Sequence, residues 1–131
     1  MSKSAIYIVN STTTMVSPGE IIPLGSTVRR FGCNITQDGN TITLSGRGYY
    51  QVTATATVSP TAAGDIGITL IKDGVPVSSS SASVAAADDL VAVPITAIVR
   101  NTCDCNSSTL TFILNTTESD VIDFSVTVVK L

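Results

Sequence analysis

The side chains that could perform catalysis are few and mostly acidic. Asp88 and Asp89 are adjacent, and Glu118, Asp120 and Asp123 form a second group. Paired carboxylates can act as general acid and base or bind a hard cation. Both groups fall among Ser and Thr in expected loops, where solvated turn residues are the commoner explanation.

The chain contains no His, and this excludes the Ser-His-Asp and Cys-His arrangements that activate nucleophiles. Its glycines fall at expected turns, without the spacing of a phosphate-binding loop before a helix. We therefore predict that the protein is not an enzyme and has no catalytic residue and no cofactor.

Three cysteines, Cys33, Cys103 and Cys105, make an odd number that does not indicate a closed disulfide framework. If the Cys103–Cys105 segment is extended, its two thiols lie on one face. A zinc site needs four sulfur or imidazole ligands, so we predict no metal. Reduced thiols in loops are the expected state, with a disulfide within or between chains as the alternative.

The charge balance argues against a nucleic-acid partner. The chain has 7 basic and 10 acidic residues and a net charge of −3, whereas phosphate binding needs clustered Lys and Arg. Arg29 and Arg30 are adjacent, and we expect them in a solvated turn. No run approaches the roughly 18 apolar residues of a membrane span, so no membrane partner is expected.

The amino-terminal residues Met1–Asn10 contain an apolar stretch that is too short for a signal peptide. We therefore expect synthesis in the cytoplasm. In a chain this rich in Ser and Thr, Asn-X-Ser/Thr sequons arise by chance. Here they begin at Asn10, Asn34, Asn106 and Asn115.

Val, Ile and Thr dominate the composition, and apolar and polar residues alternate along most of the chain, as is typical of strands. Lys72-Asp73-Gly74 predicts a tight hairpin whose return strand begins at Val75. The tract Ser78–Asp89 fits either a flexible loop or a strand of small residues. The expected strands are Ala5–Val9, Ile21–Leu24, Phe31–Thr36, Thr41–Ser45, Tyr49–Val58, Ile66–Ile71, Leu90–Val99, Thr109–Leu114 and Ile122–Leu131.

About eight to ten strands with frequent turns predict an all-β sandwich or barrel. We expect one domain over residues 1–131, in which residues 1–9 form an anchoring segment or an edge strand. In the strand Tyr49–Val58, we expect Tyr50, Val52, Ala54 and Ala56 to face the interior. In the last strand, we expect the interior residues to be Ile122, Phe124, Val126 and Val128.

Six short motifs follow one another along the chain in an order that resembles that of a known family. They are Phe31-Gly32, Ile42–Leu44, Gly48-Tyr49-Tyr50, Asp73–Val77, Pro94–Ile98 and Ser125–Leu131. This order is similar to the carboxy-terminal domain of collagen-like exosporium glycoproteins of spore-forming bacteria. Those domains are jelly rolls of the tumour necrosis factor-like and complement globular-head kind. The resemblance implies a jelly-roll sandwich that assembles as a homotrimer, with one sheet of each protomer packed around a threefold axis.

The faces opposite the expected interior would then contact neighbouring protomers. They are uncharged, as a subunit contact tolerates; the alternative is that their Thr residues face water in a monomer. The predicted interface residues are Tyr49, Gln51, Thr53, Thr55, Ser125, Thr127, Val129 and Leu131.

Unlike the exosporium proteins, this chain has no Gly-X-Y collagen stalk. We therefore expect a phage virion component, such as a capsid decoration, head fibre or tail-associated module, made in the bacterial cytoplasm. Its partners would be other copies of itself and a capsid or tail protein, which Met1–Val9 would anchor. A spore-surface protein is one alternative. Another is a receptor- or glycan-binding head that uses the loops Ser59–Gly64, Ser78–Asp89 and Arg100–Ser108, although these loops lack the aromatic residues of most glycan sites.

Overall fold

The computed structural model describes residues 3–102 and 107–131, and within them it contains strands and turns but no helix. The described residues thus contain no helix capable of crossing a membrane. The strands are β1 (Ala5–Asn10), β2 (Thr14–Val16), β3 (Ser26–Phe31), β4 (Ile35–Asp38), β5 (Thr41–Leu44), β6 (Gly48–Pro60), β7 (Gly64–Lys72), β8 (Val75–Val84), β9 (Val91–Asn101), β10 (Ser108–Asn115) and β11 (Ser119–Lys130).

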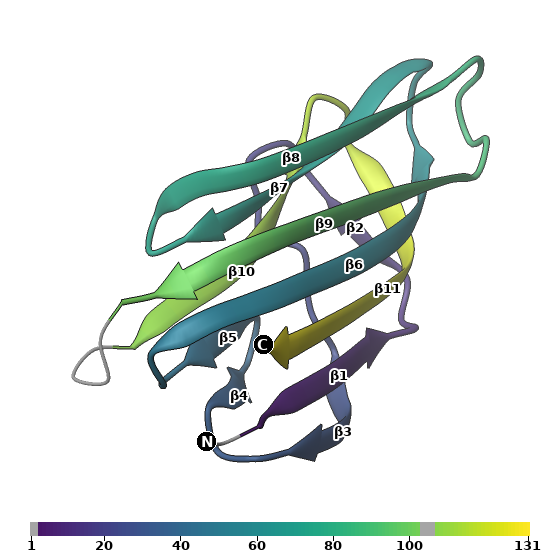
Figure 1. Cartoon of the computed structure of the whole chain (residues 1–131). Coiled ribbons are helices and arrows are strands. Elements are labelled where there is room, and N and C mark those ends of the chain that lie inside the picture. The colour runs from purple at the N-terminus through teal and green to yellow at the C-terminus, as the bar shows by residue number, and fades with distance from the viewer. Residues whose placement is uncertain (1–2, 103–106) are drawn as a thin grey trace.

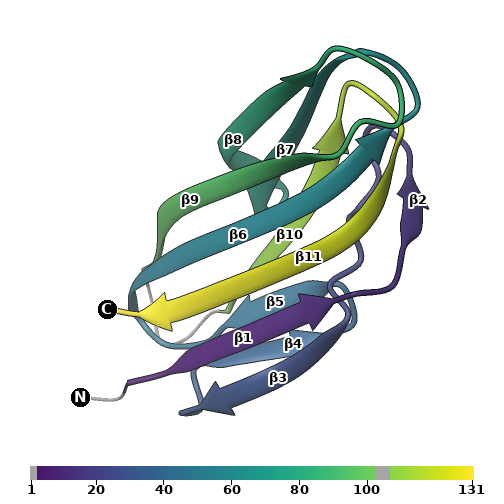
Figure 2. The same cartoon turned by 90° about the vertical axis from the view of Figure 1, so that its right-hand side faces the viewer.

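These strands form two antiparallel sheets that face each other as layers (Figures 1 and 2). The first sheet has the order β3-β1-β11-β6-β9, and β2 also pairs with β11. The second sheet has the order β4-β5-β10-β7-β8. The expected all-β sandwich is therefore confirmed.

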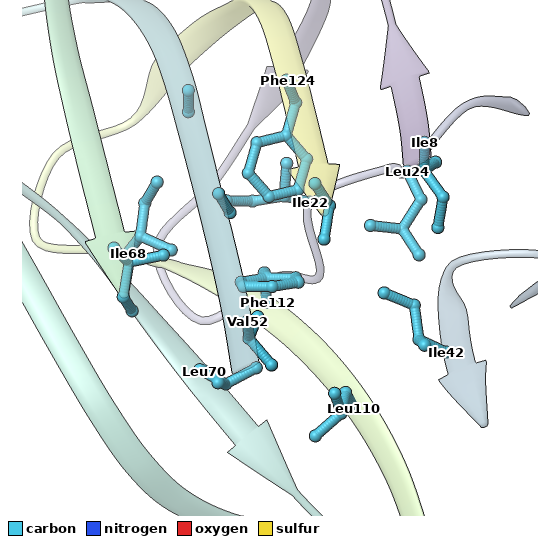
Figure 3. Close-up of a cluster of buried hydrophobic side chains, with 14 of the residues drawn as sticks. Ile8, Ile22, Leu24, Ile42, Val52, Ile68, Leu70, Leu110, Phe112 and Phe124 are labelled. Atoms are coloured by element: carbon cyan, nitrogen blue, oxygen red, sulfur yellow. The ribbon is translucent and has the colours of Figure 1, made fainter. Parts of the chain in front are cut away.

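The core lies between the two sheets and is built from one face of each strand (Figure 3). Phe112 of β10 meets Phe124 of β11 edge to face, with ring centroids 5.2 Å apart and an interplanar angle of 81°. Such a pair stabilises the core beyond its buried area, because the positive ring edge faces the negative ring face. The ring of Tyr50 is also buried, and its hydroxyl donates to the carbonyl oxygen of Gly46.

The face assignment of the long strand β6 is confirmed, since Tyr50, Val52, Ala54 and Ala56 are all buried. In β11, Phe124, Val126 and Val128 are buried as expected, but Ile122 is only half-buried. The pairing of β11 with β6 shifts between Val121 and Asp123. This β-bulge reverses the alternation, so Val121 takes the buried position that was expected for Ile122.

Two expected strands near the amino terminus are wrong in detail. Ile21–Leu24 forms a single bridge, between Ile21 and Ile113, and no strand. Its buried side chains, Ile22 and Leu24, cover the core from an irregular segment, because Pro23 has no N–H to donate to a ladder.

The expected strand Phe31–Thr36 is divided between β3, which ends at Phe31, and β4, which begins at Ile35. Gly32 lies between them with φ +79°, a backbone conformation that turns the chain and that L side chains rarely adopt. Arg29 and Arg30 lie within β3, so the expectation of a solvated turn is wrong, although both side chains are exposed.

The tract Ser78–Asp89 forms a strand of small residues as far as Val84, followed by a turn. The predicted hairpin is confirmed: Lys72 pairs with Val75, and both Asp73 and Gly74 have positive φ. Positive φ at both central residues matches the type I′ turns that suit the strand twist.

Candidate subunit interface

The outer face of the first sheet, which points away from the core, contains three rows of facing residues. In an antiparallel ladder, paired residues share a face, so the strand register defines each row. The first row is Phe31, Ala5, Val129, Gln51 and Ile98; the second is Arg29, Tyr7, Thr127, Thr53 and Thr96; the third is Ser26, Val9, Ser125, Thr55 and Pro94. We call these rows and the adjoining Tyr49 and Leu131 the outer face.

Large apolar and aromatic side chains on the outer face are exposed to solvent. Ile98 is 62% exposed, Phe31 57%, Tyr49 52% and Tyr7 42%, and Leu131 at the end of β11 is 62% exposed. Several large exposed apolar side chains on one face of a sheet are typical of protein–protein contacts.

Within the three rows the charges lie at the periphery, whereas the next row toward the start of β11 contains Asp123 beside Thr57. Arg29 is on the edge strand β3, and Arg100 is on the edge strand β9, where its guanidinium lies 5.5 Å from the centre of the Tyr49 ring. This cation–π contact keeps the Arg100 side chain over the ring. The middle of the face, around Thr53 and Thr127, is therefore uncharged.

A shallow apolar hollow of about 110 Å³ interrupts the outer face between β1 and β3. Five of its six lining residues belong to the rows and the sixth is Ile6; the five are Ala5, Tyr7, Arg29, Phe31 and Thr127. A depression of this size and polarity suits one apolar side chain of a neighbouring protomer.

The structure brings the sequence-derived interface residues together. On β6, Tyr49, Gln51 and Thr53 are exposed and Thr55 is half-buried. The β11 residues that face Gln51, Thr53 and Thr55 are all half-buried: Val129, Thr127 and Ser125. Leu131 follows β11, and its N–H donates to the carbonyl oxygen of Tyr49 at 2.9 Å. That these eight residues contact another subunit remains a prediction.

Sequence reasoning missed Tyr7, Phe31 and Ile98, which complete the outer face. In β9 both alternating sets of residues contain apolar side chains, so the alternation alone did not identify the outward set. The signal available was that the inward set, with Val93, Ile95 and Val99 buried, is the more β-branched of the two.

The acidic groups do not converge on a site. Asp88 lies in the turn before β9 and its N–H donates to the carbonyl oxygen of Pro60 at 2.8 Å. Glu118 accepts a hydrogen bond from the Ser17 hydroxyl at 3.1 Å. Asp120 and Asp123 lie on β11. Among residues 3–102 and 107–131, no group of three potential metal ligands is close enough to hold an ion.

The carboxyl group of Asp73, in the turn between β7 and β8, has a lowered pKa. The Thr109 N–H donates to its carboxylate at 2.9 Å, and this bond is the main cause that lowers the pKa of Asp73 below its usual value. Burial opposes this shift, and the Lys72 ammonium, 3.5 Å from the carboxylate, lowers the pKa further. The Asp73 carboxylate therefore has a structural role, since its hydrogen bond with Thr109 links the β7–β8 hairpin to β10.

Of the cysteines, Cys33 is exposed in the turn between β3 and β4, whereas Cys103 and Cys105 lie outside the described residues.

Two of the asparagines that begin Asn-X-Ser/Thr sequons form hydrogen bonds within the fold through their side-chain amides. Asn10 Nδ2 donates to the carbonyl oxygen of Pro23 at 3.1 Å, and Asn115 Nδ2 donates to the Thr69 hydroxyl.

No protein-family model matches the chain, and no curated protein matches it in sequence. Solved structures do match. Murine APRIL superposes with a TM-score of 0.77 at 12% identity, covering 98% of this chain and 99% of that one. The globular domain of zebrafish complement 1qA protein gives 0.70 at 12% identity, covering 97% and 95%.

The PRD1 vertex protein P5 gives a TM-score of 0.68 at 18% identity, covering 98% of this chain and 96% of its own. Likenesses at such identities concern the fold. The expected resemblance to tumour necrosis factor-like and complement globular-head jelly rolls is thereby confirmed. These three proteins, which otherwise differ, each superpose on nearly the whole chain. The chain therefore has the tumour necrosis factor-like jelly-roll fold.

Proposed function

We propose that the protein is a non-enzymatic homotrimeric surface module whose protomers associate through the outer face. The observation that carries this proposal is the composition of that face: three rows without a charge at their centre, and exposed Ile98, Phe31 and Tyr7. Water-facing sheets rarely leave such side chains uncovered, whereas subunit contacts favour aromatic residues and disfavour central charges.

The second sheet differs from the first in the side chains of its outward side. Its outward residues on β7, β8 and β10 include the exposed Ser81 and the half-buried Thr111, Ile71 and Ile113, and Val77 at the start of β8 is 46% exposed. These residues include no aromatic side chain, so the exposed aromatic residues of the first sheet favour that sheet as the subunit contact.

The particle setting that we propose is a phage virion surface, with a capsid or tail protein as the further partner. The likeness to the PRD1 vertex protein P5 supports this setting. A spore surface is the alternative setting that the sequence resemblance raised.

Size-exclusion chromatography with light scattering tests the assembly. We expect a mass three times the 13.5 kDa of one chain. A mass equal to one chain at micromolar concentration would contradict the proposal. Mass spectrometry of purified particles from the host tests the setting, and absence of the chain from them would contradict a virion role.

A receptor- or glycan-binding head is the second candidate function. It is favoured by a hollow of about 460 Å³ on the second sheet, lined by Thr69, Pro76, Val77, Ser78, Ser79, Ile113 and Asn115. Hydroxyl and amide groups there could bind a polar ligand. A glycan array tests this function, and we would require any signal to disappear in Ser79→Trp, which fills the hollow.

A further inference from the structure

Charged residues separate along the direction of the strands. All seven Lys and Arg residues lie near the end where β1 begins and β11 ends (Figure 2). This basic end consists of Lys3, Arg29, Arg30, Arg47, Lys72, Arg100 and Lys130. The strand register supports the grouping, since Arg30 faces Ile6 and Arg100 faces Tyr49, the second residues of β1 and β6.

Seven of the ten acidic residues lie toward the opposite end, where β6 and β8 end and β7, β9 and β11 begin (Figure 1). This acidic end consists of Glu20, Asp65, Asp88, Asp89, Glu118, Asp120 and Asp123. Of the other three, Asp73 pairs with Lys72 at the basic end, Asp38 lies at the end of β4, and Asp104 is outside the described residues.

The two ends are too far apart to neutralise each other within one protomer. Ten residues of β11 separate Asp120 from Lys130, which is roughly 33 Å at about 3.3 Å per residue. Exposed charges are screened over about 8 Å at physiological ionic strength. Both sets therefore act on whatever lies beyond their own end of the molecule.

The partners within the acidic end leave its charge uncompensated. Glu118 and Asp65 accept hydrogen bonds from the hydroxyls of Ser17 and Ser83. Glu20 accepts one from the N–H of Ser17 at 2.8 Å. These neutral donors orient the carboxylates without cancelling their negative charge.

We propose that copies of the protein stack end to end, with the basic end of one copy on the acidic end of the next. One chain carries both complementary surfaces, so a second copy meets the requirement for charge complementarity. The contact joins two different surfaces, so a pair of copies keeps one acidic and one basic end free for a further copy. Stacking does not depend on the trimer proposed above, although a trimer would present three copies of each charge set.

Two charge-reversal variants test the stacking. Lys3→Glu with Arg30→Glu reduces the net charge of the basic end, counted with Asp73, from +6 to +2. Asp89→Lys with Glu118→Lys reduces the net charge of the acidic end from −7 to −3.

All four side chains are exposed. Arg30 Nε donates to the carbonyl oxygen of Ile35 at 2.8 Å and Glu118 accepts a bond from the Ser17 hydroxyl, so circular dichroism and thermal unfolding check that each variant keeps the fold. Asp38→Lys is the control: it reverses an exposed charge that belongs to neither set, one row beyond Lys72 in the strand register, and adds positive charge on the side of the basic end.

Sedimentation velocity is run at about 20 mM and about 500 mM salt, which changes the screening length severalfold. We expect the unmodified protein and Asp38→Lys to form species at least about twice as heavy at low salt as at high salt. Each double variant alone should not, and an equimolar mixture of the two should regain the heavy species.

The proposal is overturned if the unmodified protein has the same mass at both salt concentrations, or if mixing the variants restores nothing. Anisotropy with a fluorescent DNA duplex at low salt is the competing arm, and DNA binding without self-association would also overturn the proposal. The mass at high salt reports the trimer separately, so failure of stacking and failure of the trimer are distinguishable.

Discussion

Phe124 is the residue whose removal should cost the core most. Its ring is fully buried and packs edge to face on Phe112. We expect Phe124→Ala to lower the free energy of unfolding by about 3–5 kcal/mol, because a cavity replaces the ring. Denaturant unfolding measures this loss. The exposed control Val75→Ala should change stability by no more than about 0.5 kcal/mol, and an equal loss in both variants would refute the assignment.

Asp73 should make stability depend on pH in acid. Because the pKa of its carboxyl is lower in the folded state, its contribution is present above the usual value of 3.8 and is lost as pH falls through the folded pKa. We expect Asp73→Asn, which tolerates the same positive φ, to be less stable at neutral pH by at most about 1 kcal/mol, since the site is exposed.

This difference between Asp73→Asn and the unmodified protein should shrink as the pH is lowered to about 2. Thermal unfolding at neutral and acid pH measures it. A difference that stays constant over this range would show that the charge of Asp73 does not contribute.

Single residues were predictable where a strand pairs regularly. Tyr50 and Val52 could be placed in the core from alternation alone, because β6 pairs without interruption along that stretch. Ile122 could not be placed, since the bulge in β11 is a property of its pairing with β6. The sequence of one strand does not show where its pairing with a neighbouring strand will contain an extra, unpaired residue.

At the scale of elements, comparing two glycines distinguishes the cost of backbone strain from the cost of a steric clash. Gly25 has φ +81°, and a side chain there would lie 2.4 Å from the carbonyl oxygen of Val9. Gly39 has φ +61° with open space around it. We expect Gly39→Ala to cost about 1–2 kcal/mol from strain, and Gly25→Ala about 1–3 kcal/mol more from overpacking against β1.

Chemical denaturation of the two glycine variants measures this difference. Equal costs would show that the segment before β3 moves away from β1 at little expense, contrary to the close contact in the structure.

The elements that could not be predicted are those at the edges. All six residues of β3 are exposed, so no alternation marks the strand, and its existence depends on pairing with β1. The expected strand Ile21–Leu24 has the right buried residues but the wrong backbone. Burial is read from side-chain type, whereas a ladder also needs N–H groups, and Pro23 has none.

At the scale of the whole molecule, the proposed trimer can be separated from the fold by one substitution. Thr53 lies at the centre of the outer face, between Thr127 and Thr96, away from Arg100. Thr53→Asp would bury a charge without a partner at the subunit contact. We expect light scattering to show single chains with a retained strand spectrum, whereas Thr53→Ser and the exposed Val75→Asp should keep the larger mass. An unchanged mass for Thr53→Asp would contradict the interface.

The candidate interface was predictable in part. Eight of its residues follow from alternation in β6 and β11, which lie at the centre of the first sheet. Tyr7, Phe31 and Ile98 needed the order of strands across the sheet, because β1, β3 and β9 become neighbours of that centre only through pairing between distant parts of the chain.

The proximity of β1 and β11 has a consequence for the rate of folding. The N–H of Lys130 donates to the carbonyl oxygen of Ser4 at 2.9 Å. The pairing of these strands therefore closes a loop that contains nearly every residue of the chain. Such distant closures slow folding, because their entropy is lost before many contacts form. A circular permutant with a short linker between these two ends, opened at the exposed Gly39 turn, would make the same pairing local. The permuted chain should reach the same fold faster.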